Sequence, residues 1–503
     1  MEKARGHARL GTSRRDFLVG AAATGAGALL PAELSSAGRR RRRRRKVDVA
    51  VVGAGLAGLT AAQRLSRARV EVCLLEARDR VGGRVLNHRV EPGVIAELGG
   101  QYVGPTQDRL LALADSLGVD TFPTYNEGDN VLVLSGRRSR YPANPGLSPD
   151  PEFQEAILAA IAKLDPMAAE VPVDAPWKAP RAEEWDAITF ETWKQQNLTT
   201  EGSRKLFDIA CEGVWGADPR QMSLLYALAY IAGAGNENTP GSFVRLVTTP
   251  GGAQESRFVG GSQRIAQLLA RGLGERVVLS SPVRSIEQGR GRVIVTSDRV
   301  VVEADQVVVA LPPAVARRID FTPALPRAKR KLLESLVPGR LIKWQAVYDE
   351  PFWRDQGLSG QAVSEVGPAN TTFDNTPPSG SPGILFGFVG GTEARRFAKL
   401  SRRARREAVL GNFVQLFGAA AADPRASFDL NWTSEAWTRG CPVGHAGKGV
   451  LSRYGPALRK RTGRIHWAGT ETADYWNGYM DGAVRSGRRA TTQALAGLGR
   501  SGP

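Results

Sequence analysis

The stretch from Val47 to Arg84 constrains the fold of this 503-residue chain more than any other part of its sequence. A near-continuous apolar run over 47–52 predicts a strand that is buried on both faces. Gly53, Gly55 and Gly58 then form the pattern G-x-G-x-x-G. In this pattern the first glycine permits a tight turn, the second lets a pyrophosphate approach the backbone, and the third lets the next helix pack close to the strand. The stretch therefore predicts a dinucleotide whose phosphates lie at a helix N-terminus.

An acidic residue stands at the distance that ribose binding requires. We expect the helix from Leu56 to about Ser66, and a second apolar strand over 70–75 that ends at Glu76. Glu76 follows Gly58 by 18 residues, close to the ~20 that are typical of a carboxylate accepting a ribose hydroxyl. A glycine triplet alone is weak evidence. A bound dinucleotide is predicted by the combination, in this order, of a strand, the glycine triplet, a helix, a second strand and an acidic residue.

Length and composition are those of a soluble α/β enzyme with more than one domain. A chain of 503 residues favours roughly two to four domains, and 42% hydrophobic residues with 57 glycines suit such an enzyme. The net charge of +18 is unevenly placed, because residues 1–46 contribute +10 of it. The three cysteines, Cys73, Cys211 and Cys441, form an odd and sparse set, which argues against a disulfide framework.

The first 46 residues indicate a targeting segment and a basic linker. Residues 1–37 contain SRRDFL from Ser13, which resembles a twin-arginine export signal, and an apolar stretch over 18–30 that is too short for a membrane span. The cationic run over 39–46 repels itself, so we predict a solvated linker over 38–46. No aromatic residue interleaves this run, which disfavours a nucleic-acid arm. We expect an exported, extracytoplasmic protein, or a cytoplasmic one if the arginine pair occurs by chance.

Glycine-rich and aromatic motifs at both ends of the chain indicate a flavoprotein. The N-terminal motifs are ARDRVGGR over 77–84 and ELGGQYVG over 97–104. The C-terminal motifs are WTSEAWTRGC over 432–441, GRIHWAGTET over 463–472 and YWNGYMDGA over 475–483. Together with Lys343, these motifs resemble the flavin-containing monoamine oxidase family over roughly residues 47–495.

The resemblance implies an α/β fold with a Rossmann-like FAD-binding domain and a mixed-sheet plus helical substrate domain. We assign 47–105, 260–320 and 430–495 to the FAD-binding domain, and 106–259 and 321–429 to the substrate-binding domain. The residue patterns place helices over 106–117, 152–164, 189–196, 203–214, 223–232, 263–273 and 402–417, and strands over 277–279, 283–287, 306–311, 341–348, 384–389 and 465–468.

The resemblance also implies the reaction. A flavin amine oxidase takes a hydride equivalent from the amine α-carbon, the imine product hydrolyses to an aldehyde, and oxygen reoxidises the flavin to yield hydrogen peroxide. The expected partners are a small primary amine and molecular oxygen, with no nucleic acid and no integral membrane segment. An L-amino-acid oxidase or a polyamine oxidase on the same fold stays open, as do a non-catalytic flavin-binding protein and a basic-arm nucleic-acid binder. A homodimer is the candidate assembly.

Four residues carry the expected chemistry by resemblance to the family. Lys343 matches the lysine that holds a water at flavin N5, and Tyr479 matches one wall of an aromatic cage around the substrate nitrogen. An aromatic face attracts a cation by ~0.5–2 kcal/mol. Pro442 stands where the family has the second cage tyrosine, so the cage is incomplete unless Trp476 or another residue fills the place. Cys441 matches a cysteine that is joined to the flavin 8α methyl, and a buried, unlinked cysteine is the alternative.

The remaining site residues are expected to bind FAD. The strand over 465–468 ends at Gly469, after which backbone N–H groups of a turn can face an anion, and a helix starting near Met480 can stabilise negative charge on the reduced flavin. No metal site is expected. The predicted cofactor-binding residues are Gly53, Ala54, Gly55, Gly58, Glu76, Arg78, Gly83, Arg84, Gly99, Gly100, Gln101, Val283, Trp432, Cys441, Gly469, Thr470, Glu471, Tyr479 and Met480.

Overall fold

The computed structural model describes residues 43–144, 146 and 150–500, so the predicted signal peptide over 1–37 lies outside the described residues. The first strand, β1 (Arg43–Val52), begins earlier than predicted. Residues 43–46, expected in the basic linker over 38–46, pair in parallel with 300–303 of β13 (Val300–Ala310). Their side chains are exposed or half-buried. The pairing satisfies the backbone hydrogen bonds while the charges stay in water, so the end of the basic run is a strand and not a linker.

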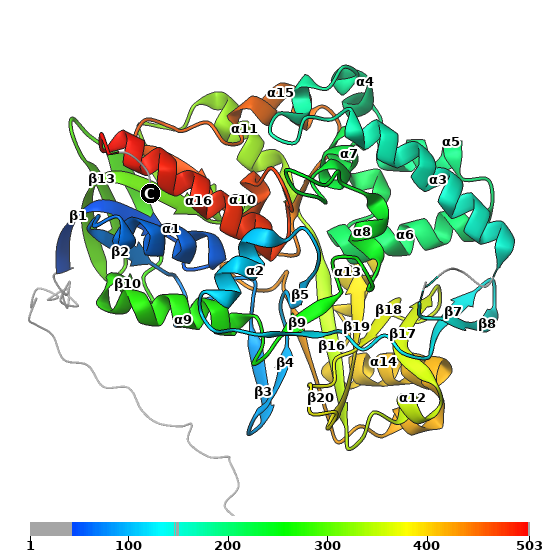
Figure 1. Cartoon of the computed structure of the whole chain (residues 1–503). Coiled ribbons are helices and arrows are strands. Elements are labelled where there is room, and N and C mark those ends of the chain that lie inside the picture. Colours follow the sequence, from blue (N-terminus) through cyan, green and yellow to red (C-terminus); the bar gives the residue numbers. More distant parts are fainter. Residues whose placement is uncertain (1–42, 145, 147–149, 501–503) are drawn as a thin grey trace, which may run out of the picture. The chain divides into compact units, whose positions relative to one another are not determined.

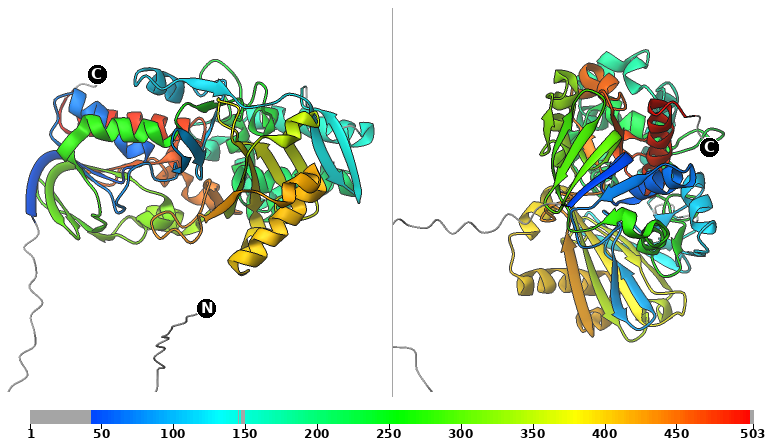
Figure 2. Two further views of the ribbon diagram at one scale, coloured as in Figure 1. Left: turned by 90° about the horizontal axis from the view of Figure 1, so that it is seen from below. Right: turned by 90° about the vertical axis from the view of Figure 1, so that its left-hand side faces the viewer.

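β1 lies near the centre of an eight-stranded sheet and runs parallel to its neighbours β2 and β13, as its buried apolar run predicts. Helices α1 (Leu56–Arg67), α9 (Gln263–Leu273) and α16 (Met480–Gly497) cover one face of this sheet (Figure 1, Figure 2). The strands in sheet order are β10 (Val277–Val278), β2 (Val72–Leu75), β1, β13, β12 (Val293–Ser297), β11 (Val283–Gln288) and β14 (Asp320–Thr322), and β22 (Ile465–Ala468) also pairs with β13.

A second sheet of seven strands is antiparallel apart from the pair β7–β17. Helix α14 (Arg402–Phe417) packs its apolar side chains against one face of this sheet. The other face contributes to the large cavity described below. The strands in sheet order are β20 (Ala426–Asn431), β16 (Leu341–Tyr348), β19 (Gly383–Gly390), β18 (Thr371–Asp374), β17 (Leu358–Ser364), β7 (Asp129–Leu134) and β8 (Arg137–Pro142).

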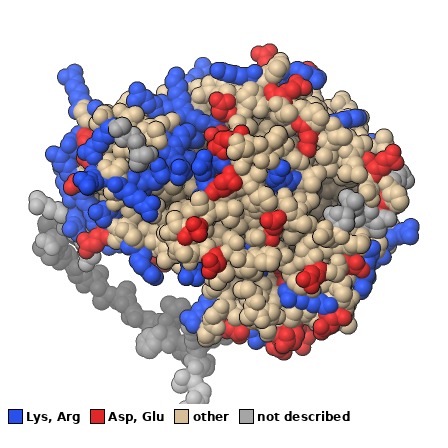
Figure 3. Space-filling view, viewed as in Figure 1, with Lys and Arg blue, Asp and Glu red and all other residues tan. Residues whose placement is uncertain are grey.

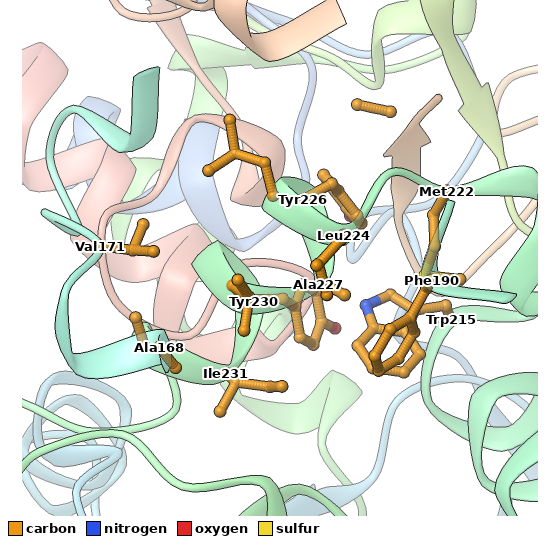
Figure 4. Close-up of a cluster of buried hydrophobic side chains, with 14 of the residues drawn as sticks. Ala168, Val171, Phe190, Trp215, Met222, Leu224, Tyr226, Ala227, Tyr230 and Ile231 are labelled. Atoms are coloured by element: carbon orange, nitrogen blue, oxygen red, sulfur yellow. The ribbon is translucent and has the colours of Figure 1, made fainter. Parts of the chain in front are cut away.

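A group of helices between residues 151 and 247 surrounds a third apolar core. Its members are α3 (Pro151–Ala169), α4 (Ala182–Ala187), α5 (Phe190–Asn197), α6 (Glu201–Trp215), α7 (Leu224–Ala232) and α8 (Phe243–Val247). Figure 4 shows side chains of α7, among them Tyr226 and Tyr230, in this core with Phe190 and Trp215. Helix α7 is buried almost all round, so it holds the layer together.

Shorter elements connect these layers. They are β3 (Asn87–Glu91), β4 (Val94–Glu97), β5 (Tyr102–Val103), β6 (Thr121–Pro123), β9 (Ser256–Phe258), β15 (Leu336–Pro338), β21 (Gly444–Ala446), α2 (Asp108–Asp115), α10 (Pro313–Ala316), α11 (Arg327–Ser335), α12 (Phe352–Asp355), α13 (Gly391–Phe397) and α15 (Val450–Tyr454). Within the described part of the chain, no helix combines the length and the apolar character that crossing a membrane would need.

Candidate active site

One cavity of about 680 Å³ extends from the eight-stranded sheet to the helical layer. Its walls come from the carboxyl ends of β1 and β2, from the glycine-rich segments over 82–84 and 99–101, from β16 and β19, and from α3, α6 and α8. Ligands of open α/β sheets bind outside the carboxyl ends of the strands. This places the dinucleotide at the sheet end of the cavity and leaves the helical end for a substrate.

The first glycine-rich turn leaves room for a ligand where the sequence predicts a pyrophosphate. Gly53 has φ +100°, which favours glycine, and a Cβ on Gly58 would overlap the Gly53 carbonyl oxygen. Gly55 differs from both, because a Cβ there would meet only the Gly83 Cα, 4.0 Å away. Gly55 and Gly83 both line the cavity. The space beside Gly55 is therefore a cradle that a side chain would fill, and it fits the phosphates of FAD.

Glu76 lies at the end of β2, where the sequence places it. Its side chain is 95% buried and lines the cavity. One carboxylate oxygen accepts from Ala54 N at 2.7 Å and the other from Arg78 N at 3.0 Å. A carboxylate has about four acceptor positions, so Glu76 can hold the turn and still accept a ribose hydroxyl.

Arg84 joins the two ends of the chain at the cavity wall. Its guanidinium donates to both carboxylate oxygens of Glu471, at 2.7 and 3.0 Å, and to the carbonyl oxygen of Pro442 at 2.7 Å. Such bidentate pairs fix orientation as well as contributing energy. Glu471 itself does not line the cavity, so it acts on the site through Arg84.

Lys343 reaches the cavity because of the alternation of β16. Ile342 and Trp344 pack into the core beneath α14, and a strand turns successive side chains to opposite faces, so Lys343 faces the cavity. Its ammonium donates to Gln101 Oε1 and to the Gly99 carbonyl oxygen at 3.4 Å.

A buried polar chain holds the Lys343 ammonium in place. Gln101 donates to Asn375 at 3.0 Å, and Asn375 donates to Gln345 at 2.9 Å. The ammonium also lies 4.3 Å from the centre of the Phe386 ring. Burial lowers the pKa of Lys343 to about 7, with Glu97 acting in the opposite direction. Near neutral pH this side chain can hold or release a proton.

Tyr479 faces the cavity and Trp476 does not. Tyr479 lines the cavity beside Tyr230, with ring centres 6.1 Å apart, and burial raises the pKa of its phenol. Trp476 is 1% exposed, packs edge-on against Tyr479 at 4.8 Å, and donates to the Thr106 carbonyl oxygen at 3.1 Å. Trp476 stands behind the cavity wall, so the prediction that it completes an aromatic cage is wrong.

Cys441 lines the cavity and forms no disulfide. Its neighbours in a small apolar cluster are Leu341 and Trp432, and the Trp432 indole donates to the Leu98 carbonyl oxygen at 2.8 Å. Burial raises the pKa of the thiol to about 12, although Arg84 and Lys343 act to lower it. The thiol is therefore protonated at neutral pH, because burial raises its pKa by more than Arg84 and Lys343 lower it.

The loop before α16 brings a helix N-terminus to the cavity. Thr470 donates to the Tyr479 carbonyl oxygen at 2.8 Å, and Gly469 N donates to Ser486 at 3.0 Å. Met480, the first residue of α16, lines the cavity. The N-terminus of this 18-residue helix can thus stabilise negative charge on a flavin ring.

Most of the predicted site residues line this cavity, and a few support it from behind. Ala54, Gly58, Glu471 and Trp476 do not line it. The predicted residues that do line it are Gly53, Gly55, Glu76, Arg78, Gly83, Arg84, Gly99, Gly100, Gln101, Val283, Lys343, Trp432, Cys441, Gly469, Thr470, Tyr479 and Met480.

The sequence analysis missed several lining residues. These are Tyr230 in the helix predicted over 223–232, Phe388 in the strand predicted over 384–389, and Trp437 and Thr438 in the motif over 432–441. Arg78 donates to Thr438 Oγ1, which brings the motif over 432–441 to the ribose end of the cavity. The alternation of β19 could have indicated Phe388, because Leu385 and Val389 occupy the opposite face.

Comparisons with known proteins agree with this geometry. The family model for flavin containing amine oxidoreductases matches residues 56–495, and a model for the twin-arginine translocation pathway signal sequence matches residues 11–31. A putative flavin-containing monoamine oxidase (AofH) of Mycobacterium tuberculosis is 44% identical over 90% of this chain and 97% of its own length. Human amine oxidase [flavin-containing] B is 36% identical over 90% of this chain and 87% of its own length.

Solved structures of amine oxidases also resemble this chain. Cyclohexylamine oxidase from Brevibacterium oxydans superposes with a TM-score of 0.86 at 34% identity, covering 91% of this chain and all of its own. Wild-type putrescine oxidase bound to putrescine superposes with a TM-score of 0.85 at 33% identity, covering 90% of this chain and 100% of its own. The chain carries a twin-arginine export signal, and it belongs to the flavin containing amine oxidoreductases, which carry out FAD-dependent amine oxidation.

Proposed function

We propose that this protein is an exported oxidase of primary monoamines whose carbon substituent is apolar, with molecular oxygen as electron acceptor. One observation supports the substrate class above the others. Among the described residues over 106–259 and 321–429, Lys343 is the one charged side chain that lines the cavity. The remaining walls at this end are mostly aliphatic and aromatic side chains of α3, α6, α8, β18 and β19.

The lack of any described charged side chain other than Lys343 on this wall disfavours both rival substrates. A diamine needs a carboxylate for its second ammonium, and the carboxylate found among the described lining residues is Glu76, at the ribose end. An amino acid needs a free guanidinium for its carboxylate. Arg204, Arg220 and Arg245 do not line the cavity. Two of them bond to main-chain carbonyl oxygens: Arg204 to Leu198 at 2.8 Å and Arg245 to Ala234 at 2.6 Å.

The chain's own residues position and deprotonate the amine. Bound FAD would supply the hydride acceptor and pass electrons to oxygen. The Tyr479 ring attracts the ammonium form of the substrate, and burial in the apolar wall lowers the pKa of that ammonium, so that the neutral amine becomes accessible. Lys343, with a pKa of about 7, can hold a water or accept its proton beside the flavin.

In this proposal one sheet binds the cofactor and the other binds the substrate. The eight-stranded sheet with α1, α9 and α16 supplies the FAD-binding residues, and the seven-stranded sheet with the helical group supplies the substrate wall. This division supports the domains proposed from the sequence. Lys343 comes from the seven-stranded sheet, so the substrate part also provides a residue that acts beside the flavin.

We further propose that Cys441 carries the flavin as a thioether to its 8α carbon. The free thiol lines the cavity. Burial raises its pKa, and Arg84 and Lys343 act against this rise. The new S–C bond replaces one S–H and one C–H bond. The two electrons and two protons released leave with oxygen, the acceptor already named for the enzyme.

A substrate panel with peroxide detection tests the proposed function. On purified yellow protein, cyclohexylamine, hexylamine and benzylamine should give kcat/KM well above putrescine and L-phenylalanine. An apolar amine leaves no second charge unpaired in this cavity. A substrate with a second charge leaves that charge unpaired, which should lower kcat/KM by about tenfold or more. Faster turnover of putrescine or of L-phenylalanine would contradict the proposed substrate class. Absence of peroxide with every amine would contradict the oxidase assignment.

A further inference from the structure

A second cavity, of about 470 Å³, lies between β3 and α9. It shares no lining residue with the first cavity. Figure 3 shows Lys and Arg gathered on the half of this face that carries α1, α9 and α16 in Figure 1.

Three exposed arginines line this second cavity. Arg264 and Arg271 are seven residues apart on α9, so they share one face of the helix, and Arg89 approaches from β3. None of the three forms an ion pair with a described residue, and no acidic residue is among the described residues that line the cavity. The side-chain bond described for Arg264 goes to the Val259 carbonyl oxygen at 3.5 Å.

The walls between the arginines are polar and well anchored. Gln267 lies between Arg264 and Arg271 on the same helix face and also lines the cavity. Gln263 accepts from Asn87 N at 2.8 Å and donates to the Val81 carbonyl oxygen at 2.8 Å. Helix α9 and β3 are thus held together at the base of the cavity by hydrogen bonds.

We propose that this cavity binds a soluble small molecule through a phosphate or sulfate group. A guanidinium presents five N–H donors in a planar fork that matches an oxyanion. Three such groups without a neutralising carboxylate create a positive potential that an oxyanion relieves. The cavity is an open groove between exposed side chains, so the phosphate or sulfate group of a small ester can reach it from solution.

Calorimetric titration of the holoenzyme tests this site. Inorganic phosphate and glycerol phosphate are titrated separately at constant ionic strength, which keeps general charge screening equal. We expect saturable binding with one site per chain. The double variant Arg264→Gln/Arg271→Gln should lose at least about tenfold in affinity, because two charge-assisted contacts disappear.

A matched variant separates this site from general surface charge. Arg327→Gln/Arg330→Gln removes the same charge from exposed positions of α11, outside the cavity. It should bind both anions as the wild type does, and both double variants should keep the flavin absorbance and amine oxidation of the wild type. If the α9 variant fails to fold, Arg89→Gln alone provides the same comparison.

No saturable binding to the wild type, or an equal loss in both double variants, would overturn the proposal.

Discussion

Replacing Lys343 by methionine tests the buried ammonium that the site places beside the flavin. Lys343 is 2% exposed, and burial lowers its pKa from 10.5 to about 7. In the unfolded chain the same side chain keeps its proton up to its ordinary pKa of ~10.4. Between about pH 7 and 10.5, the unfolded protein therefore binds a proton at this position that the folded protein does not.

The sign and size of the effect follow from this difference. Stability rises with pH wherever the unfolded state binds more protons, by about 1.4 kcal/mol per pH unit for one group. From pH 7 to 9 the wild type should gain about 2–3 kcal/mol relative to Lys343→Met, which has no proton to release. The Gln101 acceptor that methionine leaves unpaired costs about 1–3 kcal/mol at every pH. This constant cost shifts the difference in unfolding free energy between the two proteins but does not change the slope of that difference against pH.

Guanidinium unfolding at pH 6, 7, 8 and 9 measures this slope. The quantity of interest is the difference in unfolding free energy between wild type and variant at equal flavin content. Lys329, whose pKa is also lowered to about 7 by burial, is present in both proteins and cancels. Lys399→Met, at an exposed position, should show the same pH dependence of the unfolding free energy as the wild type. Parallel pH curves for wild type and Lys343→Met would refute the reasoning.

Three further predictions address the cofactor and export. Gly55→Asp should fold, because a Cβ fits there, but it should lose most of its flavin because the carboxylate repels the pyrophosphate. Gly55→Ala is the control, and full flavin absorbance in the aspartate variant would contradict the proposed phosphate site at Gly55. Arg14→Lys with Arg15→Lys should leave the protein in the cytoplasm, as cell fractionation checks, and normal export would contradict the role of the arginine pair. Acid-denatured wild type should keep its yellow colour in the pellet, whereas Cys441→Ala should release it to the supernatant; release from the wild type would refute the thioether.

Elements with strong local patterns could be predicted from the sequence almost to the residue. Helix α9, helix α14 and strand β22 have the predicted bounds. The two helices have apolar residues at helical spacing and a glycine after the last residue, and β22 is a short buried run that ends at Gly469. The start of β1 could not be predicted in this way. Its arginines are held in the strand by pairing with β13, more than 250 residues away in the chain, and local charge gives no sign of that partner.

The direction in which a motif points is harder to predict than the motif itself. Tyr479 and Trp476 stand three residues apart in one motif, yet only Tyr479 lines the cavity. Trp476 has φ +54°, which turns the backbone at that point, and no periodicity applies in such a turn. Tyr230 was missed for a different reason. Helix α7 is apolar on nearly all sides, so its sequence does not show which side faces a cavity.

The site also depends on pairings that no local pattern contains. Arg84 lies in the second glycine-rich segment and Glu471 lies 387 residues later, and each is intelligible alone as a flavin-binding residue. Their ion pair shows that Glu471 instead fixes Arg84, which in turn holds the carbonyl oxygen of Pro442 beside Cys441. A change in any one of these residues should therefore disturb the position of the Cys441 thiol. Segments from the two ends of the chain therefore form one wall of the site.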